Sequence, residues 1–239
     1  MWTKEECRAF FERILGLGLT DTEVTAIWDE LNKNQLTPVS KHGGNNIGFT
    51  PQKLRSLITL ATERTKSTLR DPRFKKVSEE IIPAIFFTLL LKYFGQGEHL
   101  IVSTDSADIA LVDFNKENAG QVNRRVGALS VEALFITESA IFSASGASSA
   151  KKIADIIITR KFRKRYIPET VLLATLNAKV KNLSFEELSN LLSGHVGNPF
   201  PQIWIFTGLD TENCIIARLH PTLEIHHLHV ARDLLSLMY

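Results

Sequence analysis

The sequence predicts an α/β protein in which a helical N-terminal region precedes a core of mixed strands and helices. Helix-start signals and helical spacing of apolar residues dominate up to about residue 95, whereas short runs of β-branched residues recur after it. We therefore expect a helical region over residues 1–95, which would recognise DNA or a partner, and an α/β core over residues 96–239. For 239 residues, one elaborated domain and a core with an appended region are both compatible with the length.

Helix signals fill the first part of the chain. Thr3 with Glu6, and Thr20 with Glu23, have the spacing of a capping box, in which a hydroxyl and a carboxylate satisfy the free amides of a helix start. Thr50 precedes a proline that suits the first helical position of a third helix. The elements expected in this region are helices over 4–16 and 21–34, a polar loop over 37–48, a helix from 51, and a helix from Ser78 to Phe94.

Strand signals alternate with helix signals in the second part. Apolar residues at helical spacing between Val122 and Ile136 predict a helix over residues 121–137. Two β-branched runs, Ile153–Thr159 and Thr170–Lys179, predict strands joined by a basic segment. The other elements expected here are strands over 99–104, 108–114, 202–207 and 214–219, and helices over 184–194 and 226–238.

Composition narrows the class of protein. Hydrophobic residues make up 44% and charged residues 23%, which excludes a disordered, collagen-like or disulfide-scaffold chain. A net charge of +2 is too small to indicate nucleic acid by itself, so any basic surface must be local. Cys7 and Cys214 lack the spacing of a zinc or redox motif. With no signal-peptide pattern and no apolar run of the ~20 residues that a membrane span needs, we expect a cytoplasmic protein without a membrane segment.

Glu132 lies within the expected helix 121–137, Asp155 within the expected strand 153–159, and Asn177 and Lys179 within the expected strand 170–179. This order of elements, with these residues, resembles the PD-(D/E)XK nuclease superfamily, which has the restriction-endonuclease-like fold. In that family a helix contributes a glutamate, the second strand an aspartate, and the third strand an acid-x-lysine triplet. The resemblance covers residues 126–206. It implies that Glu132 lies on a helix, that Asp155 lies on the second strand, and that Asn177 and Lys179 share one face of the third strand.

The resemblance also implies a metal site and a mechanism. Asp155, Glu132 and the backbone carbonyl of Ala178 would ligate Mg²⁺, for which Mn²⁺ is a substitute, and Lys179 would orient the attacking water. Asn177 departs from the family pattern, because a carboxamide is a weaker ligand for a hard cation than the expected acid. A catalytically inactive nuclease-fold protein that binds nucleic acid or serves in assembly is therefore the alternative to an active enzyme.

Basic residues beside this site suggest the substrate. A cluster of lysines and arginines binds phosphates with an affinity that falls steeply with salt, although such runs are also found as solvated hairpin tips. The residues expected to contact nucleic acid are Arg160, Lys161, Arg163, Lys164, Arg165, Arg124 and Arg125. The leading hypothesis is a Mg²⁺-dependent DNA endonuclease of restriction or antiviral defence type, with RNA still open as a substrate. The resemblance implies a homodimer, since such enzymes commonly dimerise to cut both strands.

The same family pattern fits the chain a second time. In this placement Glu80 lies on a helix, Asp108 on the following strand and Glu132 on a third strand. The lysine position is then filled by Leu134, an aliphatic residue, and for that reason the first placement is preferred. The two placements share Glu132 and differ in the element that carries it. A small-molecule enzyme built around the glycine-rich segment near His42 is a third hypothesis.

Overall fold

The computed structural model describes most of the chain and divides it into two compact units. The first unit comprises Met1–Thr104, Leu111–Gly127 and Met238–Tyr239, and the second Asp105–Ala110 and Ala128–Leu237. This division differs from the boundary expected after residue 95. The described residues are 2–34, 40–42, 46–102, 109–113, 128–142, 148–176, 180, 183–209 and 212–238.

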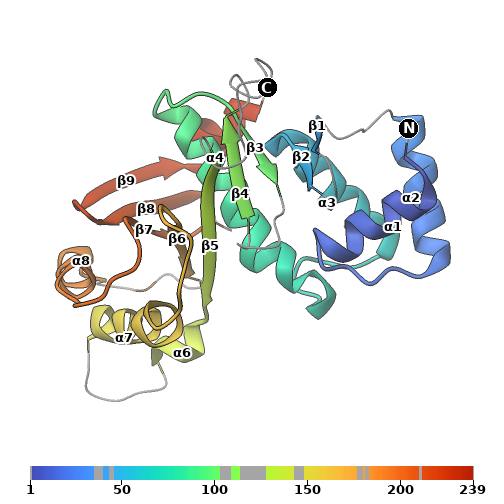
Figure 1. Ribbon diagram of the computed structural model, residues 1–239. Coiled ribbons are helices and arrows are strands. Elements are labelled where there is room, and N and C mark those ends of the chain that lie inside the picture. The colour runs from blue at the N-terminus through green and yellow to red at the C-terminus, as the bar shows by residue number, and fades with distance from the viewer. Residues whose placement is uncertain are drawn as a thin grey trace. The chain divides into compact units, whose positions relative to one another are not determined.

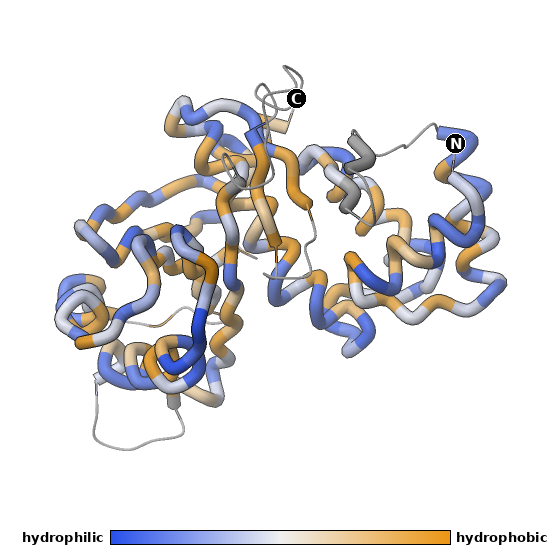
Figure 2. Tube along the Cα trace, viewed as in Figure 1, coloured by the Kyte–Doolittle hydropathy of each residue, from blue (hydrophilic) through white to orange (hydrophobic). Residues whose placement is uncertain are grey.

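Helices dominate the first unit, as the sequence predicts. Both capping boxes are confirmed, because the hydroxyls of Thr3 and Thr20 accept hydrogen bonds from the backbone N–H groups of Glu6 and Glu23. The apolar faces of these helices are buried and their polar faces are exposed, so hydrophobic and hydrophilic residues alternate along the helical part of this unit (Figure 2). The helices are α1 (Lys4–Arg13), α2 (Asp21–Lys33), α3 (Pro51–Thr65), η1 (Pro72–Phe74), η2 (Val77–Ile81) and α4 (Ile82–Tyr93).

Two sequence expectations in this unit are wrong. The expected polar loop contains β1 (Ser40–His42) and β2 (Asn46–Phe49), which pair antiparallel, and β2 pairs antiparallel with β3 (His99–Val102). Ser78 does not start the buried helix. It lies inside η2, and its hydroxyl donates to the carbonyl of Phe74 one turn earlier. The glycine and asparagine residues of segment 37–48 favour a loop, but that composition does not exclude short strands beside it.

The second unit is built on a mixed sheet. Strands β5 (Ala128–Ile136), β6 (Val171–Leu176) and β7 (Gln202–Thr207) run parallel, and β8 (Asn213–His220) and β9 (Glu224–His229) are antiparallel to their neighbours. β4 (Ile109–Asp113) crosses the boundary between the units. The predicted α/β class, a mixed sheet flanked by helices and preceded by a helical region, is confirmed.

Helices cover one face of the second unit's sheet (Figure 1). Side chains of β5, β6, β7 and β8 form a single buried cluster with residues of the helices, including Ile153, Ile157, Leu188 and Leu192. The helices are α6 (Glu138–Phe142), α7 (Ser149–Ile157), η3 (Ile158–Phe162) and α8 (Phe185–Ser193), and the helical turns η4 (Val230–Leu234) and η5 (Leu235–Met238) follow β9. This cluster fixes the face on which the candidate site lies.

Two segments of this unit have a different secondary structure from the one that the sequence predicts. The described part of the expected helix 121–137 is the strand β5, and the expected strand 153–159 is α7 continued by η3. The first error arises because a strand in a parallel sheet is apolar on both faces and lacks the polar alternation of a half-buried strand. The second arises because β-branched residues outweighed a helical pattern that begins at the Ser148 N-cap. The expected helix from residue 226 is also wrong in its first turn, which belongs to β9.

Candidate functional site

A buried ion pair joins the sheet to the helical layer in the second unit. Nζ of Lys161 lies 2.5 Å from Oε1 of Glu132. The two side chains are only 10% and 12% exposed. A charge in such surroundings is costly unless an opposite charge compensates it, and here each of the two groups has such a partner.

Alternation along β5 explains the direction of the Glu132 carboxylate. Residues two apart in a strand point to the same face, and Leu134 and Ile136 belong to the cluster beneath the helices. Glu132 therefore faces the helical layer and not the opposite face of the sheet. Its other oxygen, Oε2, has no hydrogen bond to any described residue.

Lys161 reaches this carboxylate because its segment is held against the core. Ile157 at the end of α7 is fully buried and Phe162 is 8% exposed, so the residue one turn before Lys161 and the residue directly after it both pack inward. The wider π-helical turn η3 separates them. The expectation that Lys161 contacts phosphates from the surface is therefore wrong: its ammonium is turned toward Glu132.

Asp155 lies away from this pair. It is exposed on α7, whereas Ile153, Ala154 and Ile157 of the same helix pack into the core. With 3.6 residues per turn, these positions place Asp155 on the side of α7 that faces away from the cluster. The expected arrangement, with Asp155 on a sheet strand and Glu132 opposite it on a helix, is wrong for both residues. Glu132 is half-buried on β5, whereas Asp155 is exposed on α7.

Several predicted site residues cannot be placed. Asn177, Ala178 and Lys179 lie outside the described residues, and so do Arg124, Arg125 and Asp108. Glu80, from the second placement, is half-buried in η2 of the first unit. The side chain of His42 also lies outside the description, although its backbone belongs to β1. Among the described residues, no three His, Cys, Asp or Glu side chains form a group that could hold a metal ion.

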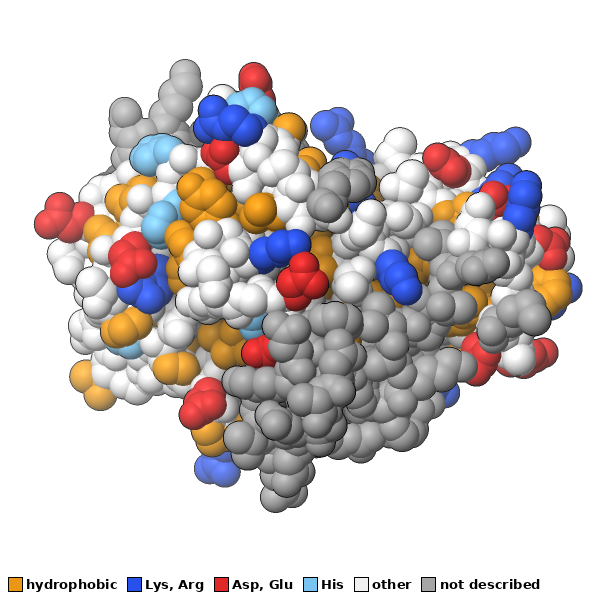
Figure 3. Space-filling model, turned by 90° about the horizontal axis from the view of Figure 1, so that it is seen from above, with side chains coloured by type: hydrophobic (Ala, Val, Ile, Leu, Met, Phe, Trp, Pro, Cys, Tyr) orange, Lys and Arg blue, Asp and Glu red, His pale blue; other side chains and the backbone are white. Residues whose placement is uncertain are grey.

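The remaining basic residues form an exposed cluster, which we call the basic segment and define as Arg160, Arg163, Lys164 and Arg165. All four side chains are exposed at the end of α7 and η3. Within the described part of the chain, none of them forms a hydrogen bond or an ion pair. On the face drawn in Figure 3, by contrast, described Lys and Arg side chains are interspersed with Asp and Glu side chains. The sequence expectation of a local basic surface therefore agrees with the exposure of these four residues.

A cavity of about 500 Å³ opens at the carboxyl ends of the parallel strands, a common position for ligands in α/β proteins. Two of the nitrogen-bearing side chains that line it already have acidic partners. Arg232 Nε donates to Asp233 Oδ1 over 2.6 Å, and His229 Nε2 lies 3.0 Å from Glu212 Oε1. The hydrogen bond from Arg232, reinforced by the backbone N–H of His229, lowers the pKa of Asp233 to about 2. Sequence reasoning missed this cavity because its lining residues come from separate elements.

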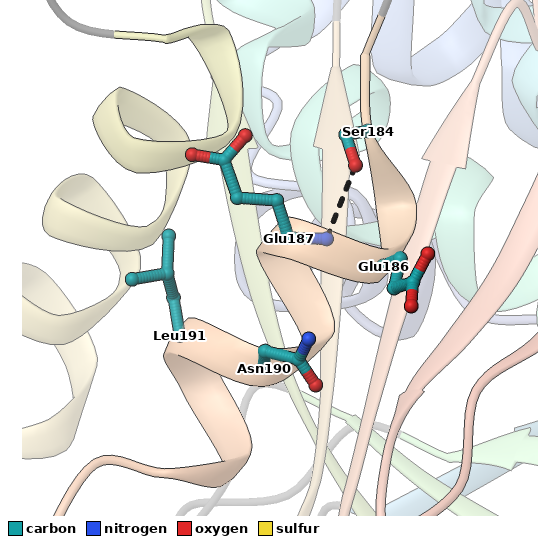
Figure 4. A pocket seen from close by; sticks show the side chains of 5 residues that line it. All are labelled: Ser184, Glu186, Glu187, Asn190 and Leu191. Carbon is teal, nitrogen blue, oxygen red and sulfur yellow. Dashed lines mark hydrogen bonds between the residues drawn. The ribbon is translucent and has the colours of Figure 1, made fainter.

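A second hollow, of about 480 Å³, lies along α8 (Figure 4). All five of its lining residues come from α8 and its N-cap: Ser184, Glu186, Glu187, Asn190 and Leu191. The hydroxyl of Ser184 accepts a hydrogen bond from the backbone N–H of Glu187, so these groups cap the helix. The carboxylates make this surface unsuitable for a polyanion.

Comparison with protein families, with curated proteins and with solved structures finds no match to the chain. In the part of the chain that the structure describes, no helix is both long enough and apolar enough to span a bilayer. The functional argument therefore rests on the Glu132–Lys161 pair and on the basic segment.

Proposed function

We propose that the second unit is a nuclease core and that the protein hydrolyses phosphodiester bonds of DNA with the help of Mg²⁺. The single observation that carries this proposal is the buried ion pair between Glu132 and Lys161. A carboxylate and an amine in contact are what the acid-x-lysine triplet supplies in the nuclease superfamily that the sequence resembles. Here the two groups come from the strand β5 and from the helical turn η3, which continues α7.

The second placement of the family pattern supports this assignment better than the first. It expects Glu132 on a strand, and β5 is a strand. Its weakness in the sequence is Leu134, which occupies the lysine position and is buried in the core. Lys161 removes that weakness, because its ammonium reaches Glu132 from the helical layer. In this proposal Lys161, in place of Lys179, supplies the amine of the site, and Asp155 is not part of the site.

The proposed chemistry divides between the pair and a cation. Lys161 would hold one oxygen of Glu132, orient the attacking water and offset negative charge that grows on the phosphate. The free Oε2 of Glu132 is a hard oxygen ligand of the kind that Mg²⁺ prefers. A bound Mg²⁺ or Mn²⁺ would polarise the phosphate and make the water more acidic. The second ligand that the proposal names is Asp108, which lies outside the described residues.

The alternative is a nuclease-fold protein that binds nucleic acid without cleaving it. The observation in its favour is the unpaired basic segment, which supplies phosphate contacts without any catalytic group. In this alternative the Glu132–Lys161 pair is purely structural. Recognition of RNA in place of DNA is the corresponding alternative for the substrate.

A plasmid-relaxation assay separates these functions. Supercoiled DNA is incubated with the wild-type protein in Mg²⁺, in Mn²⁺ and in EDTA, and then with Glu132→Gln and with Glu132→Gln/Lys161→Gln, which leaves no buried charge unpaired. The proposal expects metal-dependent nicking by the wild type and none by either variant, with unchanged near-UV circular dichroism for the double variant. Salt-sensitive binding without cleavage in any metal would support the binding module instead.

Dimerisation, a cytoplasmic location and a restriction or defence role belong to the same proposal and rest on the resemblance and the composition. A homodimer would let two sites cut both strands. Analytical ultracentrifugation with and without duplex DNA tests this part, and a single protein copy on each duplex would contradict it.

A further inference from the structure

A tight turn follows α8 and presents one hydrophobic side chain to solvent. The backbone N–H of Asn198 donates to the carbonyl of His195 over 3.3 Å, and Gly197 has a φ of +89°. A positive φ at the third position is the signature of a type II turn and favours glycine there. Val196, at the second position, is 94% exposed. We call residues 195–198 the valine turn.

Hydrogen bonds hold the valine turn at both ends. The backbone N–H of His195 donates to the carbonyl of Leu192 in α8, over 3.4 Å. After the turn, the backbone N–H of Phe200 donates to Oδ1 of Asn198 over 3.0 Å. Phe200 is 2% exposed, so the chain leaves the turn directly into the core. The turn is therefore a fixed projection, and a fixed contact group loses little entropy when it binds a partner.

Ring contacts place the valine turn beside the basic segment. The imidazole of His195 meets the ring of Phe162 edge-on, with centroids 5.2 Å apart. Phe162 directly precedes Arg163, the first of three consecutive basic residues. The ring of Phe200 packs against Tyr166, just beyond the basic segment, at 4.5 Å. The exposed valine and the basic residues thus lie next in sequence to the rings of one aromatic cluster.

The exposure of these rings indicates which form of nucleic acid, single-stranded or duplex, this surface suits. Sites for single strands combine positive charge with exposed aromatic rings on which bases stack. Phe162 and Phe200 are 8% and 2% exposed, so these two rings are too buried for bases to stack on them. The rings of His195 and Tyr166 are half-buried and pack against Phe162 and Phe200. A duplex keeps its bases stacked and presents phosphates along the edge of a groove, which suits cations flanking a projecting apolar side chain.

We propose that the basic segment and the valine turn form one surface that binds duplex DNA in preference to single strands, with the cations on the phosphates and Val196 at the groove. This inference deepens the proposed function and rests on it, because it assigns the substrate form for the same unit. Neither the resemblance nor the composition singles out Val196.

Affinity measurements on labelled DNA in EDTA test this surface without cleavage. Val196→Asp places a negative charge against the phosphates and is expected to weaken duplex binding about tenfold, because like charges at an interface are strongly unfavourable. Val196→Lys adds a phosphate contact and is expected to steepen the dependence of log affinity on log salt by about 0.9. Because Val196 is almost fully exposed, both variants should fold as the wild type does.

Matched variants separate the outcomes. Ile225→Asp makes the same chemical change at a 42% exposed residue of β9 and is expected to alter duplex affinity by less than about twofold. Arg163→Ala/Lys164→Ala is expected to abolish most binding. If it does so while Val196→Asp binds as the wild type, the valine turn is excluded and the proposed function stands. Equal wild-type affinity for single strands and duplexes would also overturn this inference, and the absence of any DNA binding would overturn both proposals.

Discussion

Nζ of Lys161 lies 2.5 Å from Oε1 of Glu132, although the two residues are 29 positions apart in the sequence. The contact ties the segment that ends α7 to the middle of β5. It places a charged pair inside a layer whose other members are almost all apolar. Such a pair rarely adds stability over apolar residues of the same size, so its presence invites a functional explanation.

The first prediction concerns the stability of this pair. Lys161→Met leaves the Glu132 carboxylate buried and unpaired, and we expect the free energy of unfolding to fall by about 3 to 5 kcal/mol. Glu132→Leu/Lys161→Met removes both charges and should recover most of that loss. Urea unfolding followed by circular dichroism measures the difference.

Lys164→Met is the matched control, because Lys164 is exposed and unpaired in the described structure. We expect it to change the free energy of unfolding by less than about 0.5 kcal/mol. A Lys161→Met variant as stable as this control would show that Glu132 and Lys161 are not in contact in solution.

The second prediction concerns the thiols. Burial raises the pKa of Cys7 to about 12 and that of Cys214 to about 11, so almost no thiolate exists in the folded protein at pH 8. Iodoacetamide should therefore label neither residue in native buffer and both in urea, as mass spectrometry of the intact protein would reveal. Rapid labelling of Cys214 without denaturant would mean that β8 is more open than the structure indicates.

The third prediction concerns the chain after β9. Arg232 and the backbone N–H of His229 lower the pKa of the Asp233 carboxyl to about 2, against about 3.9 for an unfolded aspartate. The folded-state pKa is the lower one, so the stabilisation is present above about pH 4 and is lost as the pH falls toward 2. NMR titration of the Asp233 carboxyl carbon tests this, and a midpoint near 4 would contradict it. Arg232→Ala should move the midpoint upward.

The fourth prediction concerns the start of α8. The Ser184 hydroxyl accepts a hydrogen bond from the Glu187 backbone over 3.1 Å, and Ser184→Ala removes that bond. We expect a loss of about 1 kcal/mol in the free energy of unfolding. Ser184→Asp keeps an acceptor at the cap and should stay close to the wild type. If the alanine and aspartate variants are equally stable, Ser184 does not cap α8.

Local signals predicted the capped helices and the later strands well. The capping boxes at Thr3 and Thr20 predict the starts of α1 and α2, and the N-cap at Ser184 predicts the start of α8. These predictions succeed because a cap forms hydrogen bonds only with residues close to it in sequence. The strands β6, β7 and β8 are short apolar runs bounded by polar segments, a pattern that favours buried strands.

The β5 and α7 segments could not be assigned in the same way. β5 is apolar on both faces, and its residues also fit a helical stripe. The run after Ser148 is rich in isoleucine, which favours strands, but its burial pattern of Ala150, Ile153, Ala154 and Ile157 follows a helix once the core packs against it. Tertiary packing determines the secondary structure of both segments, and a short window of sequence does not contain that information.

The candidate site was predicted in part. The resemblance to the nuclease superfamily singles out Glu132 as a site residue. It does not single out the partner of Glu132, because Lys161 lies in a run of basic residues and nothing in that run distinguishes the one that points inward. The valine turn was missed for the same reason, since Val196 becomes notable only when its exposure and its neighbours are known.

The most direct test of the central claim is the rate of DNA cleavage by Glu132→Gln compared with Asp155→Asn, under single-turnover conditions with saturating Mn²⁺. The structure pairs Glu132 with Lys161 and turns Asp155 away from the core, so we expect Glu132→Gln to lose at least about 100-fold in rate. Asp155→Asn should cleave at the wild-type rate. A variant pair with the opposite behaviour, in which Asp155→Asn is inactive and Glu132→Gln is not, would contradict the account.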